Sequence, residues 1–109
     1  MPRHPDTLQG TLDLLILKTL ERQPNHGFGI TIHIQNASGG LLTVEEGSLY
    51  PALHRLERCT LIKGSWKTTE NGRRARYYRL TAAGSKRLAE AQESWDTLAK
   101  SVTKVLRYA

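Results

Sequence analysis

An Asn-Gly pair, Asn71-Gly72, separates two runs of alternating residues, and this feature most constrains the fold. Asn-Gly between such runs is a strong signal for the tight turn of a β-hairpin. In the first run every second residue from Ile62 to Thr68 lies on one side, and Tyr78 and Leu80 match that side in the second run. The sequence therefore predicts a hairpin from Ile62 to Leu80.

Two apolar segments near the start of the chain come before this hairpin. The first, about Leu8 to Arg22, carries a helical stripe made of Leu8, Leu12, Leu15, Ile16 and Leu20. The proline and glycine of QPNHG (residues 23–27) end it. The second, FGITIHIQ (28–35), alternates strictly and so favours a strand, yet Ile30 and Ile34 are also one helical turn apart and Gly39-Gly40 would stop a helix. Both alternatives stay open on spacing alone. Residues 42–44 are a candidate short strand.

The segment GSLYPALHRLE (47–57) predicts a third helix with two unlike sides. Its leucines recur at helical spacing, which indicates a buried side. We expect Ser48 to cap its start and Pro51 to lie in the first turn, where a missing N–H has little effect. We expect it to end near Arg58 or Cys59. The other side carries short hydrogen-bonding side chains: Ser48, Tyr50, His54 and Arg55.

The last segment predicts a long helix, capped by Thr81 and running from Ala82 to about Leu106. Apolar residues step along it alternately by three and four, the pattern of a helix that packs on another helix along its length. No other segment is long enough to cover this seam, so we expect a homodimer. The predicted dimer interface consists of Leu88, Ala91, Trp95, Leu98, Val102 and Val105.

Three helices, a two-stranded wing and a long final helix predict a mainly α (α+β) fold, the winged helix-turn-helix with a long C-terminal dimerisation helix. We expect residues 1–80 to form a DNA-binding domain and residues 81–109 the dimerisation helix, in one compact unit. Sixteen Lys and Arg against ten Asp and Glu give a net charge of +6, which favours a polyanionic partner such as double-stranded DNA. The candidate DNA-binding residues lie on the third helix and the hairpin: Ser48, Tyr50, His54, Arg55, Lys67, Arg73, Arg74 and Arg76.

Each of these residues also has a plainer interpretation. Tyr50 and His54 could pack on a neighbouring element, Arg55 could be merely solvated, and the wing could be an ordinary basic turn. For the whole protein, the alternative is a winged-helix module whose basic face docks an acidic protein partner.

Four motifs resemble those of the PadR-like transcriptional regulators: GTLDLLILKTL (10–20), HGFGI (26–30), GSLYPALHRLE (47–57) and RYYRLTAAG (76–84). The resemblance implies a winged-helix dimer that usually acts as a repressor, and it implies a helix over residues 28–37, which we adopt. It also implies DNA contacts for Ser48, Tyr50, Arg73 and Arg74. Thr60 departs from the pattern, since the family usually has glycine there. With one terminal helix, the chain is similar to the short subfamily.

Trp95 has two interpretations. It either fills the dimer core as a large seam residue, or lines a cavity between subunits and stacks on a flat aromatic ligand, as the resemblance to short family members implies. Such an effector would release DNA only if it bound the non-binding dimer geometry better.

We expect no enzyme activity, cofactor or metal. The four histidines have no metal-ligand spacing with each other or with Cys59, and no phosphate-binding loop or nucleophile motif occurs. The single cysteine rules out an internal disulfide and suits the cytoplasm. The polar start and the short apolar run over residues 12–20 indicate no secretory signal and no membrane span.

Overall fold

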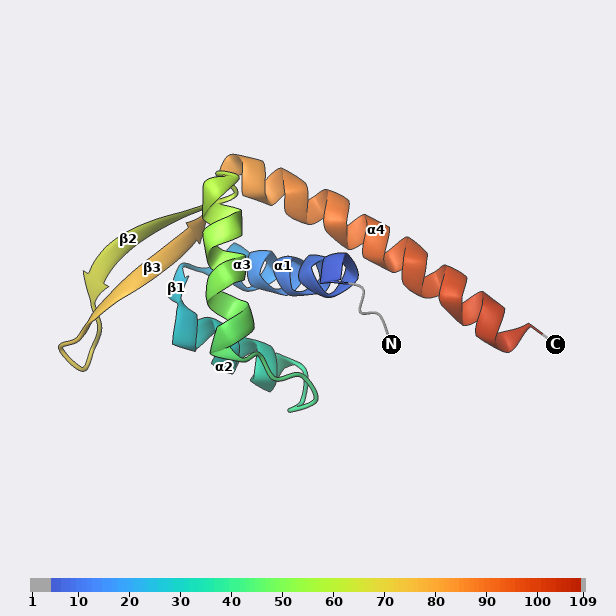
Figure 1. The fold of residues 1–109 in the computed structure, drawn as a ribbon, viewed down its shortest axis with the longest axis horizontal. Helices are drawn as coiled ribbons and strands as arrows, with labels where there is room; N and C mark the ends of the chain where they lie inside the picture. The colour runs from blue at the N-terminus through green and yellow to red at the C-terminus, as the bar shows by residue number, and fades with distance from the viewer. Residues whose placement is uncertain (1–4, 109) are drawn as a thin grey trace.

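A β-hairpin and a long helix project in opposite directions from a body of three shorter helices (Figure 1). This arrangement comes from a computed structural model, which describes residues 5–108. The elements along the chain are α1 (Pro5–Arg22), β1 (Asn25–His26), α2 (Gly27–Ala37), α3 (Glu46–Arg58), β2 (Ile62–Thr68), β3 (Arg74–Leu80) and α4 (Ala82–Arg107). The predicted winged helix-turn-helix with a long C-terminal helix is confirmed.

The segment with the alternating pattern is a helix, α2. Its first turn is capped by His26, whose Nδ1 accepts a hydrogen bond from the Gly29 N–H at 3.0 Å. Its end is closed by Gly39 and Gly40, which both have positive φ and donate to carbonyls of the last turn. Ile30 and Ile34 are buried, so the one-turn spacing rather than the alternation decides the structure.

α3 begins earlier than the sequence predicted. Glu45 is its N-cap and Glu46 its first residue, so the prediction that Ser48 caps the helix is wrong. The Ser48 N–H already donates to the Glu45 carbonyl at 3.0 Å, within the first turn. Pro51 consequently lies in the second turn, where it leaves the Gly47 carbonyl without its helical donor. Because Gly47 is exposed, water can satisfy that carbonyl.

The three strands form one antiparallel sheet in the order β1-β3-β2. β1 has two residues and pairs Asn25 with Tyr78 and His26 with Tyr77. This strand was not predicted, and the candidate strand over residues 42–44 is wrong because that segment has no regular structure. The hairpin of β2 and β3, here called the wing, pairs Ile62 with Leu80 and Gly64 with Tyr78. These residues therefore share one face of the hairpin, as predicted.

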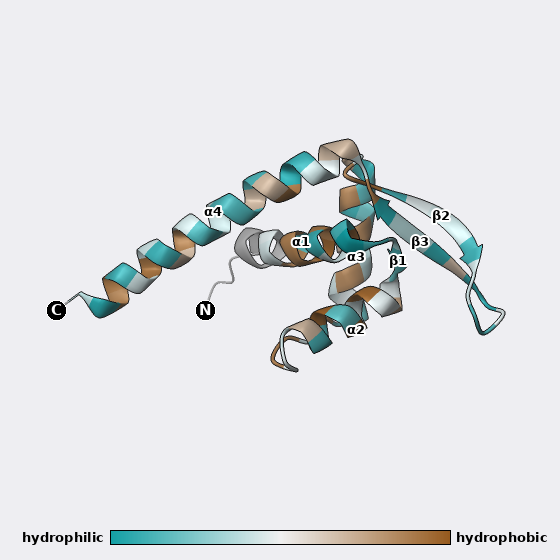
Figure 2. Ribbon diagram, turned by 180° about the vertical axis from the view of Figure 1, so that it is seen from behind, coloured by the Kyte–Doolittle hydropathy of each residue, from teal (hydrophilic) through white to brown (hydrophobic). Residues whose placement is uncertain are grey.

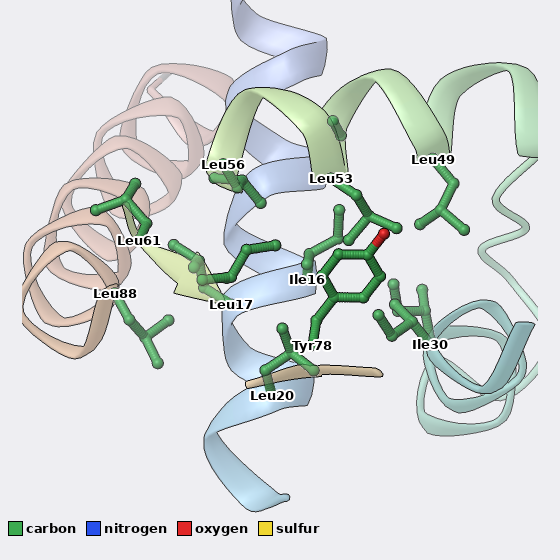
Figure 3. Packing of buried hydrophobic residues seen from close by; sticks show 13 residues of the cluster. Ile16, Leu17, Leu20, Ile30, Leu49, Leu53, Leu56, Leu61, Tyr78 and Leu88 are labelled. Atoms are coloured by element: carbon green, nitrogen blue, oxygen red, sulfur yellow. The ribbon is translucent and has the colours of Figure 1, made fainter. Parts of the chain in front are cut away.

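The hydrophobic core lies where α1, α2, α3 and the base of the wing meet (Figure 3). Of the predicted stripe on α1, Ile16 and Leu20 are buried, while Leu12 and Leu15 are only half-buried; the side chain of Leu8 lies outside the described residues. Leu17, outside that stripe, is also buried. The buried cluster consists of Ile16, Leu17, Leu20, Ile30, Ile34, Leu49, Ala52, Leu53, Leu56, Leu61, Ile62, Tyr78 and Leu88.

The buried residues of α4 lie in its first two turns, where it packs on the body. Thr81 caps it by accepting a hydrogen bond from the Gly84 N–H at 3.0 Å, as predicted. Leu88 is 2% exposed within its own subunit, so its assignment to the dimer interface is corrected: it belongs to the core and has no surface to offer a partner. Beyond it, apolar bands recur along the free part of α4 (Figure 2).

Candidate nucleic-acid interface

A groove runs between the inner face of the wing, the start of α2 and the outer side of α3. It is lined by His26, Gly27, Phe28, Tyr50, His54, Trp66, Arg73, Arg74, Ala75, Arg76 and Tyr78. Five of the predicted DNA-binding residues are therefore brought together here, from α3 and from the wing. Ser48, Arg55 and Lys67 are not part of the lining.

Tyr50 joins α3 to the start of α2. A Cβ atom added at Gly27 would lie 3.0 Å from the Tyr50 hydroxyl oxygen, so the glycine leaves room for the ring. The ring nevertheless remains 43% exposed. Tyr50 thus packs on a neighbouring element and also presents a surface to the groove, which combines the two interpretations made from the sequence.

Of the other polar residues of α3, two have exposed side chains and one forms an ion pair with α1. Ser48 and His54 are exposed, one near the start of the helix and one a turn and a half later. Arg55 instead turns to α1, where its guanidinium donates to the Asp13 carboxylate at 2.6 Å. Arg55 is therefore not merely solvated, because it ties the outer side of α3 to α1.

The wing arginines likewise include exposed side chains and one that forms an ion pair with α3. Arg73 and Arg74 are exposed and make no ion pair with any residue in the described part of the chain. Arg76 crosses to α3 and donates to the Glu57 carboxylate at 2.5 Å, and this hydrogen bond raises the pKa of its guanidinium. Lys67 lies on the opposite face of the wing, 5.6 Å from the centre of the Tyr77 ring.

Six groove residues were not singled out from the sequence as site residues: His26, Gly27, Phe28, Trp66, Ala75 and Tyr78. Phe28 and Trp66 are both more than half exposed, which is unusual for large aromatic side chains. The alternation of β2 already placed Trp66 on the same side as Ile62. It could not show that the strand extends beyond the core, so that Trp66 is exposed although Ile62 is buried.

A second hollow lies between α1 and α4 on the far side of the body from the groove. It has a volume of about 320 Å³ and is lined by Gly10, Thr11, Leu14, Ala91, Ser94, Trp95 and Leu98. Trp95, Leu98, Val102 and Val105 are all exposed in the single subunit. The predicted seam from Trp95 to Val105 is therefore an uncovered apolar surface on α4, whereas Ala91 is half-buried.

Neither a metal site nor a membrane span is found in the described part of the chain. No group of three or more His, Cys, Asp or Glu side chains there could hold a metal ion. None of its helices combines the length and the apolar composition that crossing a bilayer requires.

The family model of the transcriptional regulator PadR-like family matches residues 16–90, which include α2, α3 and the whole wing. The chain belongs to the PadR-like family. Among relatives of this PadR-like protein, Transcriptional regulator Rv3488 of Mycobacterium tuberculosis is 38% identical over 77 residues, which are 71% of this chain and 68% of that protein.

Solved structures agree with this assignment. A transcriptional regulator from Clostridium thermocellum has a TM-score of 0.81 at 31% identity, with 91% of this chain and 96% of that chain covered. The PadR-like transcriptional regulator of Bacillus cereus has a TM-score of 0.79 at 28% identity, with 95% and 99% covered. The PadR-like protein is thus a DNA-binding transcriptional regulator, and the prediction that it is not an enzyme is confirmed.

Proposed function

We propose that this protein is a dimeric, sequence-specific repressor of transcription. In this proposal residues 1–80 bind DNA and residues 81–109 pair two subunits in the cytoplasm. The observation that carries it is the groove, where exposed side chains of α3 face the same open space as two exposed wing arginines that form no ion pair with the described residues.

Each part of the groove has a role in the proposed complex. α3 enters the major groove, where Ser48, Tyr50 and His54 are short enough to reach base edges. Arg73 and Arg74 at the wing contact phosphates beside it. Arg55 and Arg76 hold α3 in place through Asp13 and Glu57, so they support the DNA-binding surface instead of contacting DNA.

The pocket between α1 and α4 supports a regulated form of this repressor. Its volume is at the lower end of the range for small-molecule sites, and Trp95 offers a flat face for stacking. We infer that a flat aromatic effector binds there, with the partner's α4 close by, and favours a dimer geometry that does not fit DNA. Titration of a Trp66→Phe variant, in which Trp95 is the remaining tryptophan, with flat aromatic compounds tests this part by fluorescence.

The DNA-binding proposal is tested by selecting bound fragments from genomic DNA and measuring their affinity against salt concentration. A double variant, Arg73→Ala with Arg74→Ala, removes four phosphate contacts per dimer, so the slope of log K against log salt should flatten by about 3.6. Tyr50→Ala should instead reduce the discrimination between selected and random duplex. An unchanged salt slope would contradict the assignment of the wing arginines.

Repression itself needs a separate measurement. A reporter gene placed behind the selected fragment should be expressed less when the protein is present. If the wild-type protein shifts neither selected nor random duplex at low salt, the alternative of a winged helix that docks an acidic protein partner is favoured.

A further inference from the structure

Trp66 has an unusual position on the inner face of the wing. Its side chain is 57% exposed, although an indole buries more apolar surface than any other side chain when it joins a core. On that face of β2 the core ends before Trp66. Ile62 is the last fully buried residue of the strand, and Gly64, which lies between Ile62 and Trp66, has no side chain. Core packing therefore does not account for Trp66.

The contacts of Trp66 are with arginines. The Arg74 guanidinium lies 5.0 Å from the centre of its ring and the Arg76 guanidinium 5.8 Å from it, both within cation–π range. Arg76 lies in turn 5.9 Å from the ring of Tyr78. These four side chains, which share one face of the wing, form a row that we call the wing ladder: Arg74, Trp66, Arg76 and Tyr78.

The inner end of the wing ladder is fixed. Tyr78 is buried in the core, and Arg76 is held by Glu57 on α3. A Cβ atom at Gly64 would lie 2.6 Å from Nε of Arg76, so the glycine provides the space through which Arg76 reaches α3. Trp66 thus rests on an arginine whose own position is set by Glu57 of α3.

The outer end of the wing ladder is free. Arg74 is exposed and pairs with no acidic side chain in the described part of the chain. A guanidinium that stacks on a ring keeps the N–H groups at its edge available for hydrogen bonds. Stacking also limits the rotamers of a long side chain, and this lowers the entropy lost when the side chain binds.

We propose that Trp66 is a positioning residue that holds Arg74 in place for a DNA phosphate. The inference rests on the proposed DNA-binding function and adds a residue to it. Because a phosphate contact carries no sequence information, losing Trp66 should weaken binding to selected and random duplex alike.

A double-mutant cycle on the dissociation constant tests this proposal. Trp66→Ala should weaken binding about fivefold in the wild-type background, which corresponds to an exposed cation–π contact. In an Arg74→Ala background the same change should weaken binding less than twofold, because the side chain that it positions is gone. A purely structural role would give the same loss in both backgrounds, and that result would overturn the proposal.

Three further variants complete the experiment. Trp66→Phe keeps an aromatic face and should retain most of the affinity, whereas Trp66→Leu keeps apolar bulk without that face and should behave like Trp66→Ala. Ser65→Ala, on the opposite face of the wing, is the matched control and should bind like the wild type. Thermal unfolding of each variant identifies any loss that comes from misfolding, and Trp66→Leu then carries the test if Trp66→Ala is unstable.

The outcomes separate this inference from the proposed function. If the wild-type protein binds no duplex, both the DNA-binding proposal and the role of Trp66 are wrong. If the wild-type protein binds DNA, but Trp66→Leu keeps wild-type affinity or the effects in the cycle are additive, only the role of Trp66 is wrong.

Discussion

Thr60 has a left-handed backbone conformation, with φ of 59°, at the position where the family resemblance implies glycine. The conformation closes α3: the Thr60 N–H donates to the Glu57 carbonyl and the Leu61 N–H to the Leu56 carbonyl. These are the two hydrogen bonds of a Schellman motif, and the buried Leu56 and Leu61 supply its apolar contact. The departure seen in the sequence therefore falls at the residue that turns the chain from α3 into the wing.

Thr60→Gly should stabilise the protein. The left-handed conformation costs a β-branched residue about 1–2 kcal/mol, and the greater freedom of glycine in the unfolded chain offsets part of that. We expect a net gain of about 0.5–1 kcal/mol in the free energy of unfolding, measured with urea. Gly72→Ala is the reciprocal control, since Gly72 has φ of 78° with open space around it, and it should lose stability. A destabilised Thr60→Gly protein would contradict this account.

Tyr78 should make the stability fall at alkaline pH. Burial raises the pKa of its phenol, although the neighbouring Arg76 charge acts in the opposite direction. The neutral phenol is thus favoured in the folded state, so its contribution is complete below a pH of about 10 and is lost as the pH rises above that value. As the pH rises above about 10, the urea midpoint of Tyr78→Phe should fall less than that of the wild type. Tyr108→Phe, an exposed tyrosine, should fall like the wild type.

At the scale of elements, the position of α4 depends on one close approach. Gly84, in its first turn, packs against the Leu61 backbone, and a Cβ atom there would lie 1.9 Å from the Leu61 carbonyl oxygen. The Thr81 N–H also donates to that carbonyl, at 3.1 Å. The turn after α3 and the first turn of α4 therefore form one packed junction.

Gly84→Ala should disturb this junction. The backbone cannot give way without moving α4, so we expect a loss of about 1–3 kcal/mol in the free energy of unfolding. Gly10→Ala in α1 is the matched control: nothing lies within 4 Å of its added Cβ, and helix propensity predicts a gain of up to about 1 kcal/mol. Equal effects of the two substitutions would contradict the close-packing argument.

The sequence predicted those elements whose evidence is local. Periodicity and turn residues were sufficient for α1, α3, α4 and the wing, but α2 needed the family resemblance. β1 escaped prediction because two residues carry no periodicity, and the start of α3 was misplaced because Glu45 caps it without a side-chain hydrogen bond. The exposed residues of the groove follow from helical spacing, whereas the ion pairs of Arg55 and Arg76 depend on tertiary contacts with residues 42 and 19 positions away.

At the scale of the whole molecule, the extents of 58 × 29 × 27 Å show how far α4 reaches beyond the body. Its exposed seam, from Trp95 to Val105, has no partner within the described part of the subunit. An exposed apolar stripe of this length is typical of a helix that packs on another helix, and it supports the proposed dimer.

Leu98→Glu should produce monomers. It places a charge in the middle of the exposed seam, where pairing would bury it without a partner. Sedimentation should show a dimer for the wild type and a monomer for the variant, with an unchanged helical content by circular dichroism. Lys100→Glu, at another exposed position of α4, is the control and should remain dimeric. A Leu98→Glu protein that sediments as a dimer would remove α4 from the interface.

α4 is unbroken from Ala82 to Arg107, and its first turns pack into the core that also holds α3. In the proposed dimer its exposed remainder would meet the second subunit. The angle at which the two α4 helices cross would then fix the distance between the two DNA-binding surfaces. A small change in that angle would alter the distance between the two surfaces, so that it no longer matches the pitch of the double helix. The fold of each subunit would stay the same.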